Sequence, residues 1–234
     1  VRILISRYAD GFLLYYEKEF CNFPFEDKSR LFFLNNSIET RVIKVFREPY
    51  LPSQRPKRIV FIGRLSDKCN ILLLLHSMIE CPDFHLDIIG SGPLLRQVKN
   101  FILSANLSER VVLHGELGCE IEISEIMNQA LLFVYPGSIG LSLLHAMAYG
   151  IPAIIHDNNS RHMPEHLVFE NHSTGVHFEF NSVSSLSKTI TKLAFDPADL
   201  SKFSARSLYL INNYYSAEHM CDNFIRCVDC VANA

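Results

Sequence analysis

One long apolar stretch, from Ala130 to Ile155, most constrains the fold of this chain because it contains no Asp, Glu, Lys or Arg. An uncharged stretch of this length would suit a membrane span. The turn residues Pro136-Gly137 and Gly150-Ile151-Pro152 instead divide it into two short apolar runs with a small helix between them. Short apolar runs are typical of parallel strands that are covered on both faces. The stretch therefore predicts a strand–helix–strand unit at the centre of an α/β domain.

Alternating strand and helix patterns surround this central unit. Strands are expected at Arg58 to Ile62, Leu86 to Ile89, Val111 to Leu113, Leu131 to Val134, Ala153 to Ile155 and Gly175 to Phe178. Helices are expected at Ile71 to Glu80, Leu94 to Ala105, Ile121 to Gln129, Leu141 to Tyr149, Val183 to Leu193, Ala198 to Tyr214 and Ala217 to Val231. This alternation predicts an α/β fold with a doubly wound parallel sheet and helices on both faces.

The composition narrows the classes of function. The chain has 234 residues, of which 48% are hydrophobic and 20% charged, and a formal net charge of −3. These values are ordinary for one large globular domain, or for one domain with a fragment of another. The slight acidity argues against a nucleic-acid-binding protein, which normally carries a basic surplus. The 7 cysteines are scattered and odd in number, which indicates reduced thiols and a cytoplasmic protein.

Glycine-containing loops follow several of the expected strands, at Gly63, Gly90, Gly115 and Gly137 to Gly140. In a doubly wound sheet these loops meet at the carboxyl edge of the strands, where ligands bind. The loop before Leu141 has the outline of an anion site, because small residues let a ligand approach the backbone N–H groups at a helix start. Tight packing alone also explains glycines in such turns, so the residues leave both interpretations open.

Two cations follow the first regular strand. Arg64 and Lys68 could both face the crevice and bind a diphosphate, the arginine through paired hydrogen bonds and the lysine as a point charge. A solvated pair in a loop, with Asp67 as neighbour to either cation, is the competing interpretation. The sequence contains no Walker-type phosphate loop, no convincing dinucleotide fingerprint and no nucleophile elbow.

Taken together, these motifs resemble the donor-binding domain of glycosyltransferase family 4. The matching residues are Gly63-Arg64-Leu65 with Lys68, Ile88 to Pro93, Leu113-His114-Gly115 and Pro136 to Pro152. The last of these motifs and the residues after it are similar to a bacterial branch that assembles capsule, exopolysaccharide or O-antigen. The resemblance implies the GT-B fold, in which two Rossmann-like domains face each other across a cleft, and sugar transfer with retained anomeric configuration.

The resemblance also implies a role for individual residues. Arg64 and Lys68 match the basic pair that stabilises the leaving nucleoside diphosphate, which makes them the expected catalytic residues, with no metal or other cofactor required. The expected donor-binding residues are Gly63, Gly115, Glu116, Gly137, Ser138, Gly140, Leu141, Ser142 and His145. The family's glutamate pair would fall at Gly137 and His145. His145 can still hydrogen-bond the ribose, whereas Gly137 has no side chain to contact the transferred sugar.

The same resemblance divides the chain. Residues 1–50 would be the remnant of an N-terminal acceptor domain with its linker, and residues 51–215 the nucleotide-sugar-binding domain. Residues 216–234 would form a C-terminal helix that packs on the acceptor domain. The expected partners are a nucleotide-sugar donor and a glycan or lipid-linked acceptor, the latter bound by the missing domain, and no nucleic acid. A cytoplasmic location is expected, and peripheral contact with the inner face of the membrane stays open.

Two other functions remain open on the sequence. One is a non-catalytic nucleotide-binding or scaffold domain of the same fold, because Gly137 and His145 replace the glutamate pair. The other is a GT-B nucleotide-sugar epimerase, which needs carboxylates or histidines over the sugar. This chain alone is expected to bind the donor without transferring the sugar. It is also expected to self-associate through the apolar face of Ala217 to Val231.

Overall fold

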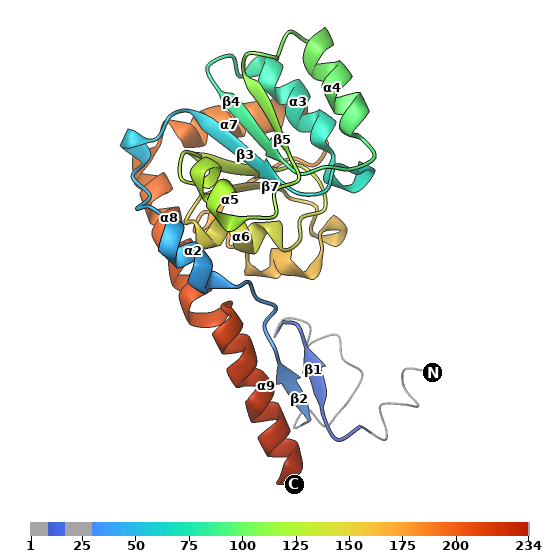
Figure 1. The fold of residues 1–234 in the computed structure, drawn as a ribbon, viewed down its shortest axis with the longest axis vertical. Helices are drawn as coiled ribbons and strands as arrows, with labels where there is room; N and C mark the ends of the chain where they lie inside the picture. The colour runs from blue at the N-terminus through green and yellow to red at the C-terminus, as the bar shows by residue number, and fades with distance from the viewer. Residues whose placement is uncertain (1–8, 17–29, 234) are drawn as a thin grey trace.

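The computed structural model describes residues 9–16 and 30–233 of the chain. Its main strands are β3 (Arg58–Ile62), β4 (His85–Ile89), β5 (Val111–Gly115), β6 (Leu132–Tyr135), β7 (Ala153–His156) and β8 (Gly175–Phe178). They form one parallel sheet in the order β5-β4-β3-β6-β7-β8 (Figure 1). The chain adds β4 and β5 on one side of β3, then crosses over and adds the remaining strands on the other side. The winding direction therefore reverses between β3 and β6.

Helices cover both faces of this sheet (Figure 1). They are α2 (Thr40–Phe46), α3 (Ile71–Glu80), α4 (Leu95–Ser104), α5 (Glu120–Met127), α6 (Ser142–Ala148), α7 (Val183–Ala194), α8 (Pro197–Tyr214) and α9 (Ala217–Ala232). On one face α3 packs against α4 and α7, and on the other α2 packs against α5 and α6 against α8. Short 3-10 turns lie at η2 (Pro52–Gln54), η3 (Asp67–Cys69), η4 (Asn159–Arg161) and η5 (Pro164–Val168). The predicted doubly wound α/β fold is confirmed.

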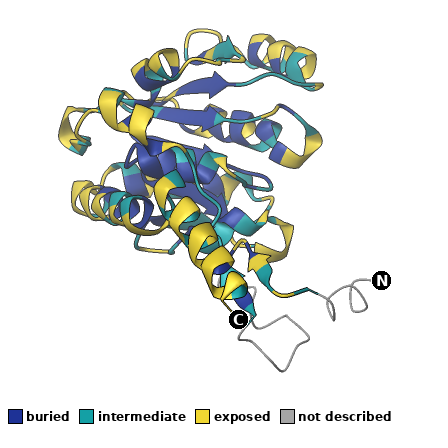
Figure 2. Ribbon diagram, turned by 60° about the horizontal axis from the view of Figure 1, so that its bottom comes forward, coloured by how far each residue is buried: buried dark blue, intermediate teal, exposed yellow. Residues whose placement is uncertain are grey.

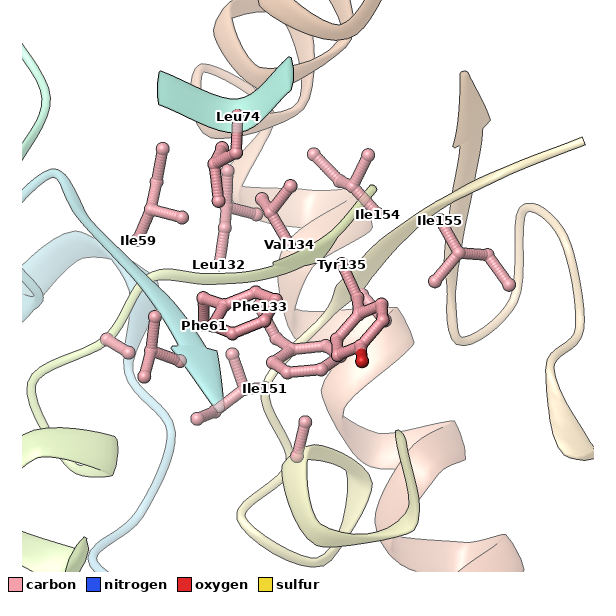
Figure 3. Close-up of a cluster of buried hydrophobic side chains, with 14 of the residues drawn as sticks. Ile59, Phe61, Leu74, Leu132, Phe133, Val134, Tyr135, Ile151, Ile154 and Ile155 are labelled. Carbon is pink, nitrogen blue, oxygen red and sulfur yellow. The ribbon is translucent and has the colours of Figure 1, made fainter. Parts of the chain in front are cut away.

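The uncharged stretch forms the centre of the core. Every residue of β6 and β7 is buried, as a parallel strand between two helical layers requires. The ring of Phe61 stacks on the ring of Tyr135, with centroids 4.9 Å apart (Figure 3). Burial is concentrated in the sheet and in the helix faces turned toward it (Figure 2). The predicted strand–helix–strand unit is confirmed, with β6 starting one residue later than expected. No helix in the described residues is long and apolar enough to cross a membrane.

Residues 40–50, which were expected to belong to the remnant and linker, pack on this domain. Ile43 of α2 lies in the main core with only 2% of its surface exposed. The carbonyl oxygen of Phe46 accepts a hydrogen bond from the Asn128 side chain at 2.8 Å, and the Tyr50 hydroxyl donates to the carbonyl oxygen of Leu131 at 2.6 Å. No pattern in the sequence predicts α2, because this short helix buries few residues.

A smaller element lies below the main domain in Figure 1. Strands β1 (Phe12–Leu14) and β2 (Leu31–Phe33) pair in parallel, and α9 runs beside β2. Within α9, Cys227 is buried, whereas Phe224 and Val228 are about half exposed. Residues 1–8 and 17–29 of the expected remnant lie outside the described residues. Self-association through α9 stays a prediction.

Candidate functional site

Two cavities lie at the carboxyl edge of the sheet, one on each side of the point where the winding reverses. The β4–β5 cavity, about 520 Å³ in volume, is formed by the loops after β3, β4 and β5. The β7–β8 cavity, about 740 Å³, is formed by η3 and the loops after β6, β7 and β8. The switch point of a doubly wound sheet is where such folds bind ligands. The sequence predicted one crevice here, and the structure has two cavities instead.

The β4–β5 cavity contains three of the predicted site residues. Gly63, Arg64 and Glu116 line it, together with the loop at Gly90 to Gly92. Gly90 has φ of +136°, and a Cβ there would lie 2.0 Å from the carbonyl oxygen of Gly63. The glycine at this position therefore serves the close approach of two loops, as the packing interpretation of the sequence anticipated. Gly115 ends β5 with φ of +73° and accepts a hydrogen bond from the Gly90 N–H at 2.6 Å.

The β7–β8 cavity contains three further predicted residues, Lys68, Gly137 and Ser138. The expected basic pair is therefore divided, with Arg64 in one cavity and Lys68 in the other. The N–H of Ser138 donates to the carbonyl oxygen of Lys68 at 2.8 Å, which joins the β6–α6 loop to η3. Both residues line the β7–β8 cavity.

Gly137 cannot carry a side chain in this fold. A Cβ at this position would lie 2.1 Å from the carbonyl oxygen of Lys68 and 2.5 Å from the carbonyl carbon of Cys69. Both atoms belong to the backbone of η3, so neither can rotate away. The carboxylate that the family pattern expects therefore has no space at this position.

The predicted anion-binding loop presents unpaired backbone donors. Among the described residues, the N–H groups of Gly140, Leu141 and Ser142 donate no hydrogen bond. Leu141, just before α6, is 50% exposed. These three residues line neither cavity. They lie on the segment that joins the loop at Ser138 to α6, where backbone N–H groups without an intrahelical acceptor are available to an anion.

His145 is held by a carboxylate that no sequence motif singles out. Its Nε2 lies 3.0 Å from Oε1 of Glu120, and the Tyr149 hydroxyl donates to the same oxygen. An ionised carboxylate only accepts hydrogen bonds, so Nε2 carries the proton. Burial raises the pKa of Glu120, but the hydrogen bonds from His145 and Tyr149 outweigh it and hold the pKa below its usual value. Of the two ring nitrogens of His145, Nε2 is therefore paired with Glu120, and the expected contact with a ribose stays a prediction.

A second buried carboxylate borders the β6–α6 loop. Glu165 is 8% exposed, and its Oε1 accepts a hydrogen bond from the Asn36 side chain at 2.7 Å. Its Oε2 is buried without a partner among the described residues and lies 3.7 Å from the Cβ position of Gly140. Glu165 lies in the first turn of η5. Its contacts with Asn36 and the loop had no signal in the sequence.

The β4–β5 half of the sheet is braced by a buried carboxylate. Asp87 in β4 is 2% exposed and accepts two hydrogen bonds from the Arg58 guanidinium, each 2.8 Å. Nε2 of His114 lies 2.8 Å from Oδ1 of the same carboxylate. These contacts connect three adjacent strands beneath the loops that form the cavity. The role of His114, which belongs to one of the family motifs, is thus a structural one in this geometry.

The fold and the cavities at the carboxyl edge of the sheet define a class of protein, a Rossmann-like domain that binds its ligand at the switch point. Comparison with solved structures narrows that class. HepE from Anabaena matches with a TM-score of 0.77 and 13% identity, over 97% of this chain and 65% of its own. Sucrose-phosphate synthase from Thermosynechococcus elongatus matches with a TM-score of 0.76 and 17% identity, over 96% and 59%. TarM from S. aureus matches with a TM-score of 0.72 and 18% identity, over 95% and 44%.

These neighbours are GT-B glycosyltransferases, and at these identities the likeness shows the fold. The chain itself belongs to the family of glycosyl transferases group 1, whose model matches residues 42–207, more than half of the sequence. No curated protein sequence matches it. The chain spans between 44% and 65% of the lengths of the three solved structures. The expected glycosyltransferase class and the Rossmann-like domain of a GT-B fold are thus confirmed.

Proposed function

We propose that this chain is the donor-binding half of a retaining glycosyltransferase of family 4. In the whole enzyme a sugar would pass from a nucleoside diphosphate to an acceptor hydroxyl, in the synthesis of capsule, exopolysaccharide or O-antigen. One observation carries the proposal: two cavities flank the switch point, and each is lined by one cation of the pair Arg64 and Lys68. A nucleoside diphosphate sugar has this layout, with a nucleoside and a sugar joined by an anionic centre.

The residues at the edge suggest how such a donor would lie. The nucleoside would occupy the β4–β5 cavity near Glu116, and the sugar the β7–β8 cavity near Ser138. The diphosphate would cross between them, within reach of Arg64 from one cavity, of Lys68 from the other, and of the unpaired N–H groups from Gly140 to Ser142. The similar structures of TarM and HepE were solved in complexes with UDP, which supports a diphosphate at this edge.

Catalysis in this proposal is electrostatic. As the bond between the sugar and the diphosphate breaks, negative charge grows on the leaving phosphate. Arg64 and Lys68 would stabilise that charge, with Arg64 as a paired donor and Lys68 as a point charge. Residues that bind charge developing in the transition state contribute several kcal/mol to catalysis, about 3–4 kcal/mol for one well-placed donor. The resemblance expects no metal for this task.

Thermal unfolding in the presence of nucleotides tests the proposal. UDP, GDP, ADP, CDP and their sugars are each added to wild type, Arg64→Ala and the matched surface variant Arg96→Ala, which changes an exposed arginine of α4. A ligand at a hundred times its Kd stabilises the folded state by about 2.7 kcal/mol. We expect one base to raise Tm in wild type and Arg96→Ala but not in Arg64→Ala. An equal rise in all three proteins would contradict the role of Arg64, and no rise with any nucleotide would refute donor binding.

A specific observation favours a second candidate. Gly137 has no space for the carboxylate that would contact the transferred sugar. A nucleotide-binding domain that has lost catalysis would also have this feature. Donor binding by this chain, combined with transfer by the whole protein, would exclude that candidate. We expect no transfer by this chain alone, because the acceptor would bind to the other domain.

The remaining assignments are proposals on the same basis. Residues 1–50 would belong to the acceptor domain and linker, residues 51–215 to the donor domain, and residues 216–234 to a helix that packs on the acceptor domain. The chain spans 44% of TarM, which is consistent with a further domain in a whole enzyme. The acceptor would be a glycan or a lipid-linked glycan. The protein would act in the cytoplasm, with peripheral contact at the inner face of the membrane.

A further inference from the structure

The β7–β8 cavity carries two cations that the fold leaves unpaired. Lys68 lines it from η3 and Arg161 from η4. Neither forms an ion pair with any described residue. The Arg161 guanidinium lies over the ring of Phe180, 5.3 Å from its centroid, and Phe180 also lines the cavity. Stacking of this kind holds a guanidinium in place while its N–H groups remain free for a ligand.

A buried histidine also belongs to this lining. His156, at the end of β7, lines the cavity and is 0% exposed. Its Nδ1 accepts the N–H of Asn158 at 3.2 Å, so the neutral ring carries its proton on Nε2. That Nε2 is buried without a partner among the described residues. Burial, with the neighbouring His162, lowers the pKa of His156 to about 4, so the ring is neutral at pH 7.

The ring of His156 has little freedom to turn toward another acceptor. It stacks on His162 with centroids 3.8 Å apart, and the edge of Phe180 packs against it at 4.8 Å. Nε2 of His162 lies 2.9 Å from the carbonyl oxygen of His156, which fixes the stack. A buried N–H without an acceptor costs free energy, and the packed ring keeps this N–H beneath the lining of the cavity.

Cations therefore outnumber carboxylates in this lining. The described lining residues include two cations, Lys68 and Arg161, and one carboxylate, Asp67, and Gly137 has no room for a second carboxylate. A neutral sugar presents hydroxyl groups that need acceptors as well as donors. A sugar that bears a carboxylate brings its own acceptors and a negative charge, which matches two unpaired cations.

We infer that the β7–β8 cavity binds a sugar acid, whose carboxylate is held by the guanidinium of Arg161. The inference rests on the proposed function, because it takes the occupant to be the sugar unit of the nucleotide donor. It names the class of that unit: a uronic acid rather than the corresponding neutral hexose. Lys68 then serves the diphosphate and the sugar acid at the boundary between the cavities.

Pairs of nucleotide sugars that differ only in a carboxylate group test this inference. Calorimetry compares UDP, UDP-glucose and UDP-glucuronic acid, and in parallel GDP, GDP-mannose and GDP-mannuronic acid, on wild type, Arg161→Gln and the exposed control Arg226→Gln. We expect one acidic donor to bind at least about tenfold more tightly than its neutral partner, the size of one charge-assisted hydrogen bond. Arg161→Gln should remove that preference without changing the affinity for the bare nucleotide, and Arg226→Gln should keep it.

The outcomes separate the inference from the proposed function. Binding of UDP or GDP with no preference for the acid, or a preference that survives Arg161→Gln, overturns the sugar acid and leaves the proposed function in place. Failure of every nucleotide, here and in the thermal unfolding series that includes ADP and CDP, overturns both. Salt gives a second measurement that no folding defect can imitate: the preference for the acid should fall as ionic strength rises. A preference that is insensitive to salt also counts against the carboxylate contact.

Discussion

Substitution of Gly137 by alanine tests the close backbone contact between the β6–α6 loop and η3. The added Cβ would lie 2.1 Å from the Lys68 carbonyl oxygen, so either η3 or the β6–α6 loop must move. That movement breaks the hydrogen bond from the Ser138 N–H to the same oxygen. Overpacking of this kind costs about 1–3 kcal/mol. At about 2–4 °C per kcal/mol for a chain of this size, we expect Tm to fall by roughly 2–12 °C.

The matched control is Gly118→Ala. A Cβ at Gly118 meets no atom of the described residues within 4 Å, so the substitution adds the same methyl group without a contact. Both substitutions also restrict the unfolded chain, which by itself stabilises the fold by about 0.4–1 kcal/mol. The difference between the two variants therefore isolates the contact at Gly137. Gly118→Ala should leave Tm unchanged or slightly raised.

The measurement is thermal unfolding of the three proteins by circular dichroism, followed by nucleotide titration. Because η3 carries Lys68, Gly137→Ala should also weaken binding of the preferred nucleoside diphosphate. If Gly137→Ala unfolds at the same temperature as Gly118→Ala and binds the nucleotide equally well, the close backbone contact is not present in solution. Steric exclusion by η3 would then be the wrong explanation for the missing carboxylate.

Two further predictions concern stability. Asp87→Asn leaves Arg58 and His114 without their carboxylate. Because this breaks a largely buried ion pair, we expect the free energy of unfolding, measured by urea titration, to fall by roughly 3 kcal/mol. An unchanged urea midpoint would refute the bracing role of Asp87. The pKa of His156 is about 4 in the fold against an ordinary 6.5, so as the pH falls the unfolded chain takes up the proton first. The contribution of His156 to the free energy of unfolding is complete above pH 6.5. It falls by at most about 3 kcal/mol as the pH is lowered to 4. His162 and His177, whose pKa values are also lowered by burial, add to this decline. Urea midpoints at pH 7.5 and 5 should therefore differ less in His156→Gln than in wild type, and equal differences would show that His156 does not titrate in this way.

The sheet was predictable from the sequence because its strands are buried on both faces. β6 and β7 are uncharged runs between turn residues, and the structure places them within a residue of the expected positions. The long helices α7 and α8 were predictable for a different reason, because each has one apolar face that recurs with the helical period. By contrast, α2 is only seven residues long and buries two of them, too few to give a periodic pattern.

The site was only partly predictable. Gly63, Arg64 and Glu116 do share one cavity, because loops at adjacent strand ends must meet at one edge. Lys68 lines a different cavity from Arg64, beside a loop distant in sequence whose Ser138 N–H donates to the Lys68 carbonyl oxygen. No residue pattern encodes such a contact. The pairing of Glu120 with His145 depends on how α5 and α6 are positioned in the fold, and no pattern in the sequence predicts it.

The division of the carboxyl edge has a consequence for how such a domain changes over time. Within the described part of the chain, no residue lines both the β4–β5 cavity and the β7–β8 cavity. A substitution after β8 can alter one cavity and leave every wall of the other in place, as can an exchanged loop after β5. Specificity for the two ends of a bound molecule can therefore evolve largely independently. A chimaera joined between β5 and β6 would take the whole β4–β5 cavity from one parent, together with the η3 wall of the β7–β8 cavity.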